Sequence, residues 1–377
     1  MGSDMRKVMC PSCGGETKRF GKTAAGTQRW RCLDCGLTFV NRIDNTAKRL
    51  DEFLRWLLSK ERQSDMPGAG RTFRRRTQEF WCVWPLPPVT GEVCRVVFVD
   101  GIYLARNACV LIARGERHVL GWYVARSENS RAYKALMARI APPDVVVTDG
   151  GSGFQKARRQ LWPETRVQRC TFHAFEQVKR YTTTRPRTQA GVDLYALAKK
   201  LLKIETSGQA AAWLAAYARW CSDYDEFLKE ETTNDEGRTF LTHERLVKAR
   251  NSLTSLARSG QLFTYVDPDL VERLGALPAT NNAVESLNAQ LRAMLREHRG
   301  LSLERRVKAV YWWCYMHTEC PMSAAEILRA MPTDEDIARE MRDMSYETRA
   351  SLGPQRWGDG LVWEELHRST PWRRDWD

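Results

Sequence analysis

Three acidic residues stand at positions where the chain can bring carboxylates together. Asp100 ends the run Val-Val-Phe-Val-Asp, and Asp149 ends the run Val-Val-Val-Thr-Asp. Both runs predict buried strands with an aspartate at the carboxyl end. Glu285 lies in the later segment Thr-Asn-Asn-Ala-Val-Glu-Ser-Leu-Asn, which predicts a helix. Carboxylates from two strand ends and one helix can hold two divalent metal ions, and such a pair of ions catalyses phosphoryl transfer.

The predicted glutamate helix has two faces. An apolar stripe consists of Val284, Leu287, Leu291 and Met294, and a polar stripe beside it consists of Asn281, Glu285, Asn288 and Arg292. Taken alone, Glu285 would be an ordinary exposed glutamate. The adjoining asparagines are poor helix formers, so helix propensity does not explain them. They suit a site that orders water, metal or phosphate, and together with the two aspartates they favour a catalytic interpretation.

The elements that must position these residues form an alternating pattern. Apolar runs predict strands at 93–99, 107–113, 117–124, 144–148 and 165–169, with helices at 130–140, about 154–161 and from about 173. The order is β-β-β-α-β-α-β-α, which is that of an α/β, RNase H-like fold. The first and fourth strands of that fold are neighbours, so Asp100 and Asp149 should meet at the edge where open α/β sheets place their sites. Residues 185–280 break the alternation and predict an all-helical insertion.

Four N-terminal cysteines have the spacing of a zinc site. Cys10 and Cys13 form one Cys-x-x-Cys knuckle, Cys32 and Cys35 form a second, and a glycine follows each knuckle. Two short strands around a turn fit between them, as in a zinc ribbon. All four coordination positions would be filled, so the Zn²⁺ would be structural. Arg29 and Arg31 make this module basic enough to contact DNA phosphates.

A basic helix is expected shortly after the ribbon. Residues 46–59 predict an amphipathic helix, glycine and proline at 67–70 end it, and residues 71–81 predict a second helix. The second helix exposes four arginines: Arg71, Arg74, Arg75 and Arg76. This pattern is typical of a helix-turn-helix that enters DNA, and a solvated basic helix is the alternative.

Composition restricts the class of protein. The 377 residues suffice for two or three domains, and 59 Lys and Arg against 46 Asp and Glu give a net charge of +13. This surplus favours a polyanionic partner. The polar start lacks the pattern of a signal peptide, and no apolar run reaches the length of a membrane helix, so we expect an intracellular protein without membrane contact.

The motifs in this order resemble bacterial insertion-sequence transposases of the Mutator-like class. The segments that match are Phe-Val-Asp100-Gly, Val-Thr-Asp149-Gly-Gly, Arg169-Cys170-Thr-Phe-His173 and Asn281-Asn-Ala-Val-Glu285-Ser-Leu-Asn. The resemblance implies an RNase H-like domain with an Asp-Asp-Glu triad, Mg²⁺ or Mn²⁺ as cofactor, and strand cleavage followed by strand transfer. It also implies double-stranded DNA as partner, both terminal inverted repeats and target DNA, with a homodimer on that DNA at the bacterial nucleoid in the cytoplasm.

Two features stay open at this point. Cys170 and His173 could be half of a zinc site, but no second ligand pair lies nearby in the sequence, and a buried pair that braces the last strand and its helix fits better. An RNase H-like nuclease or resolvase would share the triad, and a zinc-ribbon DNA-binding regulator would share the basic arm. The expected domains are 1–43 for the ribbon, 44–90 for the helix-turn-helix and linker, 91–184 and 281–320 for the catalytic domain, 185–280 for the insertion and 321–377 for a C-terminal helical tail.

Overall fold

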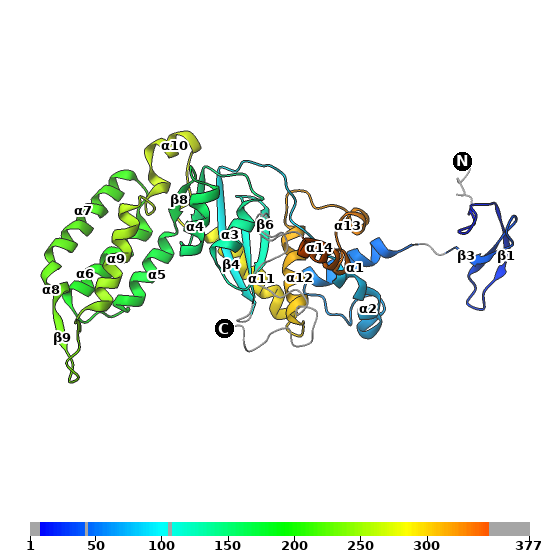
Figure 1. Cartoon of the computed structure of the whole chain (residues 1–377), viewed down its shortest axis with the longest axis horizontal. Coiled ribbons are helices and arrows are strands. Elements are labelled where there is room, and N and C mark those ends of the chain that lie inside the picture. The colour runs from blue at the N-terminus through cyan, green and yellow to red at the C-terminus, as the bar shows by residue number, and fades with distance from the viewer. Residues whose placement is uncertain (1–7, 42–43, 105–107, 347–377) are drawn as a thin grey trace.

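The computed structural model describes residues 8–41, 44–104 and 108–346. Figure 1 shows a small N-terminal sheet at one end, a central sheet covered by helices, and a helical block at the other end. No helix among these residues is long and apolar enough to cross a membrane.

The N-terminal sheet contains one strand more than the sequence predicted. Strands β1 (Thr17–Lys22), β2 (Gln28–Cys32) and β3 (Thr38–Val40) pair antiparallel in that order. The third strand escaped prediction because only three residues, Thr38–Val40, follow the second knuckle. In Figure 1 this sheet stands apart from the helices and strands that follow.

The helices predicted to read DNA pack into the body of the protein. Helix α1 (Thr46–Leu58) buries Leu50, Phe53 and Leu57, which recur at helical spacing. Helix α2 (Ala69–Thr77) contains a non-helical Gly70, and a short 3-10 helix, η1 (Gln78–Cys82), continues it. The buried side chains of these elements share one hydrophobic cluster with the central sheet and with helices near the end of the described chain. Residues 46–84 therefore form part of the same core as the sheet.

The central sheet has the order β6-β5-β4-β7-β8. Its strands are β4 (Val96–Leu104), β5 (Ala108–Arg114), β6 (Val119–Ala125), β7 (Val145–Thr148) and β8 (Arg166–Arg169). The first three pair antiparallel, and β4, β7 and β8 pair parallel. Helices α3 (Ser130–Met137), α4 (Ser152–Leu161) and α5 (Thr171–Thr182) alternate with the later strands. The predicted element order and the pairing of the first strand with the fourth are thus confirmed.

One strand boundary was predicted wrongly. Strand β4 continues past Asp100 to Leu104, so Asp100 lies within the strand and not at its end. The sequence concealed this because Asp100, Gly101 and Tyr103 interrupt the apolar pattern. β4 extends beyond its parallel neighbour because β5 pairs with it along Phe98–Leu104, whereas β7 pairs only as far as Val99.

The two faces of the sheet carry different layers. Ile102, Val110 and Trp122 on one face pack with helices α11 (Asn282–Glu297) and α12 (Leu303–Met316). Val99, Leu111 and related side chains on the other face pack with α3 and α4. The alternation of side chains along each strand therefore directs β4 towards α11 on one side and towards α3 on the other.

The insertion is not entirely helical, contrary to the prediction. Its helical elements are α6 (Gln189–Lys200), η2 (Leu201–Lys203), α7 (Ser207–Asp223), α8 (Asp225–Lys229), α9 (Glu244–Arg258), η3 (Thr264–Val266) and α10 (Pro268–Leu274). Between α8 and α9 lies an antiparallel hairpin of β9 (Glu231–Thr233) and β10 (Thr239–Leu241). The hairpin is polar and almost wholly exposed, so it lacks the apolar alternation by which strands are recognised.

The last described helices close the core over α1. Helix α13 (Ala324–Ala330) begins with a capping box, and α14 (Asp334–Tyr346) follows it. The buried Lys308 of α12 donates hydrogen bonds to the Trp81 carbonyl and to Asp334, both at 2.5 Å. Lys308 thereby joins three distant segments of the chain. The tryptophan-containing end of the predicted tail, residues 347–377, lies outside the described residues.

Candidate active site

Asp100 is held in place by two hydrogen bonds. The Gly101 amide donates to its Oδ1 at 2.9 Å, and the Asn288 side chain donates to its Oδ2 at 2.8 Å. Asn288 comes from α11, three residues after Glu285, so the glutamate helix is fastened directly to the first aspartate. Burial raises the pKa of Asp100 to about 6, and the negative charges of Asp149 and Glu128 contribute to the shift.

Asp149 directly follows β7, next to β4 in the sheet. Gly150 after it has a φ of +88°, which suits glycine, and a Cβ at that position would lie 2.3 Å from Nη1 of Arg169. Arg169 ends β8, and its pKa is lowered by burial, an effect that the charge of Asp149 opposes. A half-buried arginine therefore lies beside the glycine that follows the second aspartate.

The start of α11 is anchored to both neighbouring elements. The Asn281 amide donates to the Cys170 thiol at 3.3 Å, and the Asn281 side chain reaches the Val99 carbonyl of β4 at 3.5 Å. Cys170 precedes α5, and its own amide donates to Thr148 of β7. These contacts place the first turn of α11, with Glu285, above the strands that hold the aspartates.

Glu285 meets the Cys-x-x-His element. Its Oε1 lies 3.6 Å from Nδ1 of His173, and the ligand atoms of Cys170, His173 and Glu285 all lie within 4.8 Å of one another. A hydrogen bond with Cys170 raises the pKa of His173, and the charge of Glu285 adds to this effect. Burial acts to raise the pKa of the Cys170 thiol, but its hydrogen bonds with His173 lower the pKa overall. The third member of this cluster, Glu285, was not foreseen because it lies far from Cys170 in the sequence.

Glu128 is an acidic neighbour that the sequence analysis did not single out. It follows β6 directly before the N-cap of α3, and its charge contributes to the raised pKa of Asp100. A single glutamate before a helix has no distinctive pattern in a sequence. Only the fold shows that this one comes close to the two aspartates.

The donor set of this site fits divalent metal ions. The charge of Asp149 contributes to the raised pKa of Asp100. Three side-chain oxygens are buried without a hydrogen-bond donor among the described residues: Oδ1 of Asn281, Oε1 of Glu285 and Oδ1 of Asn288. Mg²⁺ and Mn²⁺ prefer carboxylate, amide and water oxygens. A cation of this kind would relieve the repulsion and satisfy the oxygens.

The N-terminal cysteines form a second candidate metal centre. The sulfur atoms of Cys10, Cys13, Cys32 and Cys35 all lie within 4.8 Å of one another. Cys10 and Cys35 are 3.6 Å apart, and Cys13 and Cys32 are 3.4 Å apart. The predicted ligands are therefore brought together in a set of four thiols, which is typical of structural zinc.

The predicted DNA-contacting arginines fall into two groups. Arg29 and Arg31 are exposed on β2, with their guanidinium groups 5.8 and 5.3 Å from the ring centre of Phe20. Arg71, Arg74 and Arg75 of α2 are also exposed. Arg76 differs, because it pairs with Glu52 of α1 at 3.4 Å. Arg76 therefore contributes to the packing of α2 on α1.

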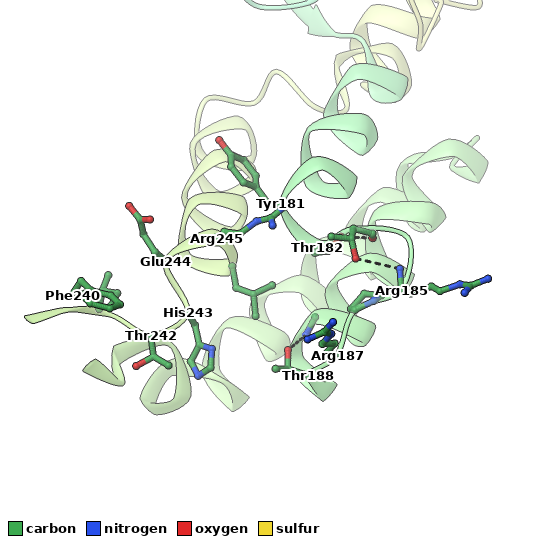
Figure 2. A pocket seen from close by; sticks show the side chains of 15 residues that line it. Tyr181, Thr182, Arg185, Arg187, Thr188, Phe240, Thr242, His243, Glu244 and Arg245 are labelled. Atoms are coloured by element: carbon green, nitrogen blue, oxygen red, sulfur yellow. Dashed lines mark hydrogen bonds between the residues drawn. The ribbon is translucent and has the colours of Figure 1, made fainter. Parts of the chain in front are cut away.

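A cavity of about 640 Å³ lies at the far end of α5 from Cys170. Figure 2 shows its lining from the end of α5, the loop to α6 and the start of α9. Three arginines line it: Arg185, Arg187 and Arg245. None of the three predicted carboxylates lines this cavity, so it is separate from the candidate active site.

Comparison with known proteins defines the class to which this fold and site belong. Residues 93–310 match the model of the family described as "Transposase, Mutator family", and this span exceeds half of the chain. The chain belongs to the Mutator family of transposases.

Individual relatives are similar over shorter stretches. The transposase for insertion sequence element IS905 of Lactococcus lactis subsp. lactis is 32% identical over 94 residues, covering 21% of this chain and 24% of the relative. The transposase for insertion sequence element IS406 of Burkholderia multivorans is 28% identical over 178 residues, covering 43% and 45%. A probable transposase for an insertion sequence element of Corynebacterium diphtheriae is 25% identical over 122 residues, covering 30% and 34%. The matched part of the chain thus spans less than half the length of each relative.

Proposed function

We propose that this protein is the DNA transposase of an insertion sequence, with an RNase H-like catalytic domain and an Asp-Asp-Glu triad of Asp100, Asp149 and Glu285. Membership of the Mutator family supports the reaction class. The observation that carries the assignment of residues is the hydrogen bond from Asn288 to Asp100, because it fastens the helix of Glu285 to the strand of the first aspartate. The five-stranded order β6-β5-β4-β7-β8 supports the RNase H-like fold.

The carboxylates of the triad would hold the metal ions. One oxygen of Asp100 accepts a hydrogen bond from the Gly101 amide, and the other accepts one from the Asn288 side chain. The orientation of this carboxylate is therefore set before metal binds. Asp149 and Glu285 approach from β7 and from α11. When bound, two divalent ions supply activation of water or of a 3′-hydroxyl and stabilisation of the leaving oxygen at the scissile phosphate. No side chain needs to act as a nucleophile.

Cys170 and His173 would position the third carboxylate. Nδ1 of His173 faces Glu285, and the Cys170 thiol accepts a hydrogen bond from the Asn281 amide at the start of α11. Both contacts act on the same turn of the glutamate helix. This role differs from the brace between the last strand and its own helix that the sequence suggested, because the contacts extend to α11.

The basic N-terminal segments would bind DNA. With zinc bound, the ribbon would present Arg29 and Arg31, and α2 would present Arg71, Arg74 and Arg75, all of which are exposed. Contacts from such arginines to phosphates give affinity, and contacts to base edges give sequence preference. The DNA would be the terminal inverted repeats and the target, with two copies of the chain acting on it.

Alanine substitution at each triad position tests this proposal. Asp100→Ala, Asp149→Ala and Glu285→Ala should each abolish Mg²⁺-dependent cleavage and strand transfer on duplexes with the element ends, whereas DNA binding should persist. The control is Glu164→Ala, at an exposed position in the loop before β8, which should keep full activity. Normal activity in any one triad variant would remove that residue from the site. Cleavage without joining of ends to a target would indicate the nuclease alternative, and lack of cleavage by the wild type would indicate a regulator.

A further inference from the structure

Glu128 stands over the residue that follows Asp100. A Cβ placed on Gly101 would lie 2.4 Å from Oε1 of Glu128 and 2.9 Å from the Cys109 sulfur. A side chain at position 101 would therefore require the Glu128 carboxylate to move, because that carboxylate occupies the space beside the glycine. The glutamate therefore lies against the backbone of β4 at the candidate active site.

The chain holds Glu128 in this position from two elements. Tyr133 of α3 donates its hydroxyl to Oε2 at 2.7 Å, and Cys109 of β5 is 3.9 Å from Oε1. Asn129 caps α3 by accepting hydrogen bonds from the amides of Arg131 and Ala132, which sets the turn that directs Glu128 inwards. The hydroxyl and the thiol are both neutral donors, so neither compensates the charge of a carboxylate.

Glu128 lies beside the same glycine that binds Asp100. The Gly101 amide donates to Oδ1 of Asp100 at 2.9 Å, and Oε1 of Glu128 lies 2.4 Å from where a Cβ of that glycine would stand. The two carboxylates therefore flank one residue of β4. Carboxylates that repel one another in a partly buried place need positive charge to stay ionised together. Divalent cations supply that charge in a compact form.

The two glutamates belong to helices or turns on opposite faces of the sheet. Glu285 lies on α11, which packs with Leu287 and Leu291 on the face of Ile102. Glu128 precedes α3, which packs with Leu136 on the face of Val99. One glutamate on each side of the sheet would therefore be available to a metal centre that Asp100 and Asp149 hold.

We propose that Glu128 is a fourth carboxylate ligand of the metal centre, serving one ion from the α3 side while Glu285 serves the other from the α11 side. The inference rests on the proposed function, because it assumes that Asp100 and Asp149 hold metal. Four carboxylates neutralise the four positive charges of two divalent ions, whereas three carboxylates leave one positive charge without a counter-charge from the protein. Gly101 is the residue that lets the fourth ligand approach.

Metal binding by the full-length protein tests the inference without relying on activity. Mn²⁺ is titrated calorimetrically into the wild type, Glu128→Gln, Asp100→Asn and the exposed control Glu164→Gln. Glutamine keeps the shape of Glu128 and can still accept from Tyr133, so the variant should fold. The wild type and the control should bind two ions at the site beyond the zinc centre. Glu128→Gln should lose one ion or bind it at least about tenfold more weakly, as loss of a charged ligand implies.

Thermal melting gives a second readout. Ca²⁺ should raise the melting temperature of Glu128→Gln less than that of the wild type, because binding to the native state is weaker. Tyr133→Phe removes only the hydroxyl that donates to Glu128 at 2.7 Å, and this variant should still bind both ions. The comparison distinguishes a Glu128 that binds metal from a Glu128 that only holds α3 in place through Tyr133. The inference would be overturned if Glu128→Gln bound two ions at wild-type affinity while Asp100→Asn lost metal binding. That result would leave the proposed function intact. Unchanged binding in both variants would instead refute the metal centre of the proposed function.

Discussion

Replacing Asp100 by asparagine should make the metal-free protein more stable above pH 6. Burial, together with the charges of Asp149 and Glu128, raises the pKa of Asp100 from 3.8 to about 6 in the folded protein. The folded state therefore binds a proton more tightly than the unfolded state does. The stability that this proton contributes is fully present below pH 4 and is lost as the pH rises through about 6. Asparagine carries no charge and escapes this loss.

The size of the effect follows from the shift. Each unit of pKa corresponds to about 1.4 kcal/mol, so the cost of ionised Asp100 is on the order of 3 kcal/mol above pH 7. Asparagine can keep the hydrogen bond with Asn288, because its side-chain oxygen can face that donor, but its amide nitrogen then cannot accept from the Gly101 amide. A lost hydrogen bond costs about 1 kcal/mol. The variant should thus fall about 1 kcal/mol below the wild type near pH 4 and exceed it by about 2 kcal/mol at pH 8.

Urea unfolding measures this difference in stability. It is followed by tryptophan fluorescence from pH 4 to pH 8, in the presence of a chelator that leaves zinc bound. Saturating Mg²⁺ should abolish or reverse the advantage, because metal stabilises the ionised aspartate. Asp235→Asn, in the exposed turn of the β9–β10 hairpin, is the control and should show no comparable trend. An Asp100→Asn protein that is less stable at pH 8, or that differs equally at every pH, would refute the reasoning.

Three further outcomes are expected. Joint replacement of Cys32 and Cys35 by serine should reduce bound zinc from one ion per chain to none by metal analysis, with the main unfolding transition preserved; retained zinc would exclude the ribbon site. Lys308→Met should lower the free energy of unfolding by about 3 kcal/mol in urea, because it leaves the partly buried Asp334 carboxylate and the Trp81 carbonyl without their cation, and no loss would show that the contact is dispensable. Joint replacement of Arg74 and Arg75 by alanine should weaken binding to the element ends more than to scrambled duplexes, by about 1–3 kcal/mol for each lost base contact; equal weakening over a salt series would show that α2 contacts only phosphate.

Much of the central fold was predictable from local patterns. The strand of Asp149 is a short run of three valines and a threonine with glycines close behind, and this pattern is typical of a buried strand that ends in a turn. Asn288 was expected near the site because it shares a helix face with Glu285, and the structure places it on Asp100. Periodicity within one element was sufficient in both cases.

The remaining features depend on contacts that local patterns do not encode. Glu128 approaches the site only because the turn from β6 to α3 directs it over Gly101, and no spacing rule marks such a residue. The contact of His173 with Glu285 joins residues more than a hundred positions apart. The β9–β10 hairpin is short and exposed, so hydrophobic patterning cannot reveal it.

The packing of residues 46–84 also constrains how the chain can acquire its structure during synthesis. Trp84 donates from its indole to Asp334 at 2.6 Å, and α1 is covered by α12 and α13. The apolar face of α1 thus leaves the ribosome roughly 250 residues before the helices that cover it. At a synthesis rate of about 5–20 residues per second, that face stays uncovered for about ten seconds or more. A nascent or prematurely terminated chain would expose this surface to chaperones and proteases. Synthesis as far as α13 therefore acts as a checkpoint, because only a chain that reaches α13 can bury its first helix.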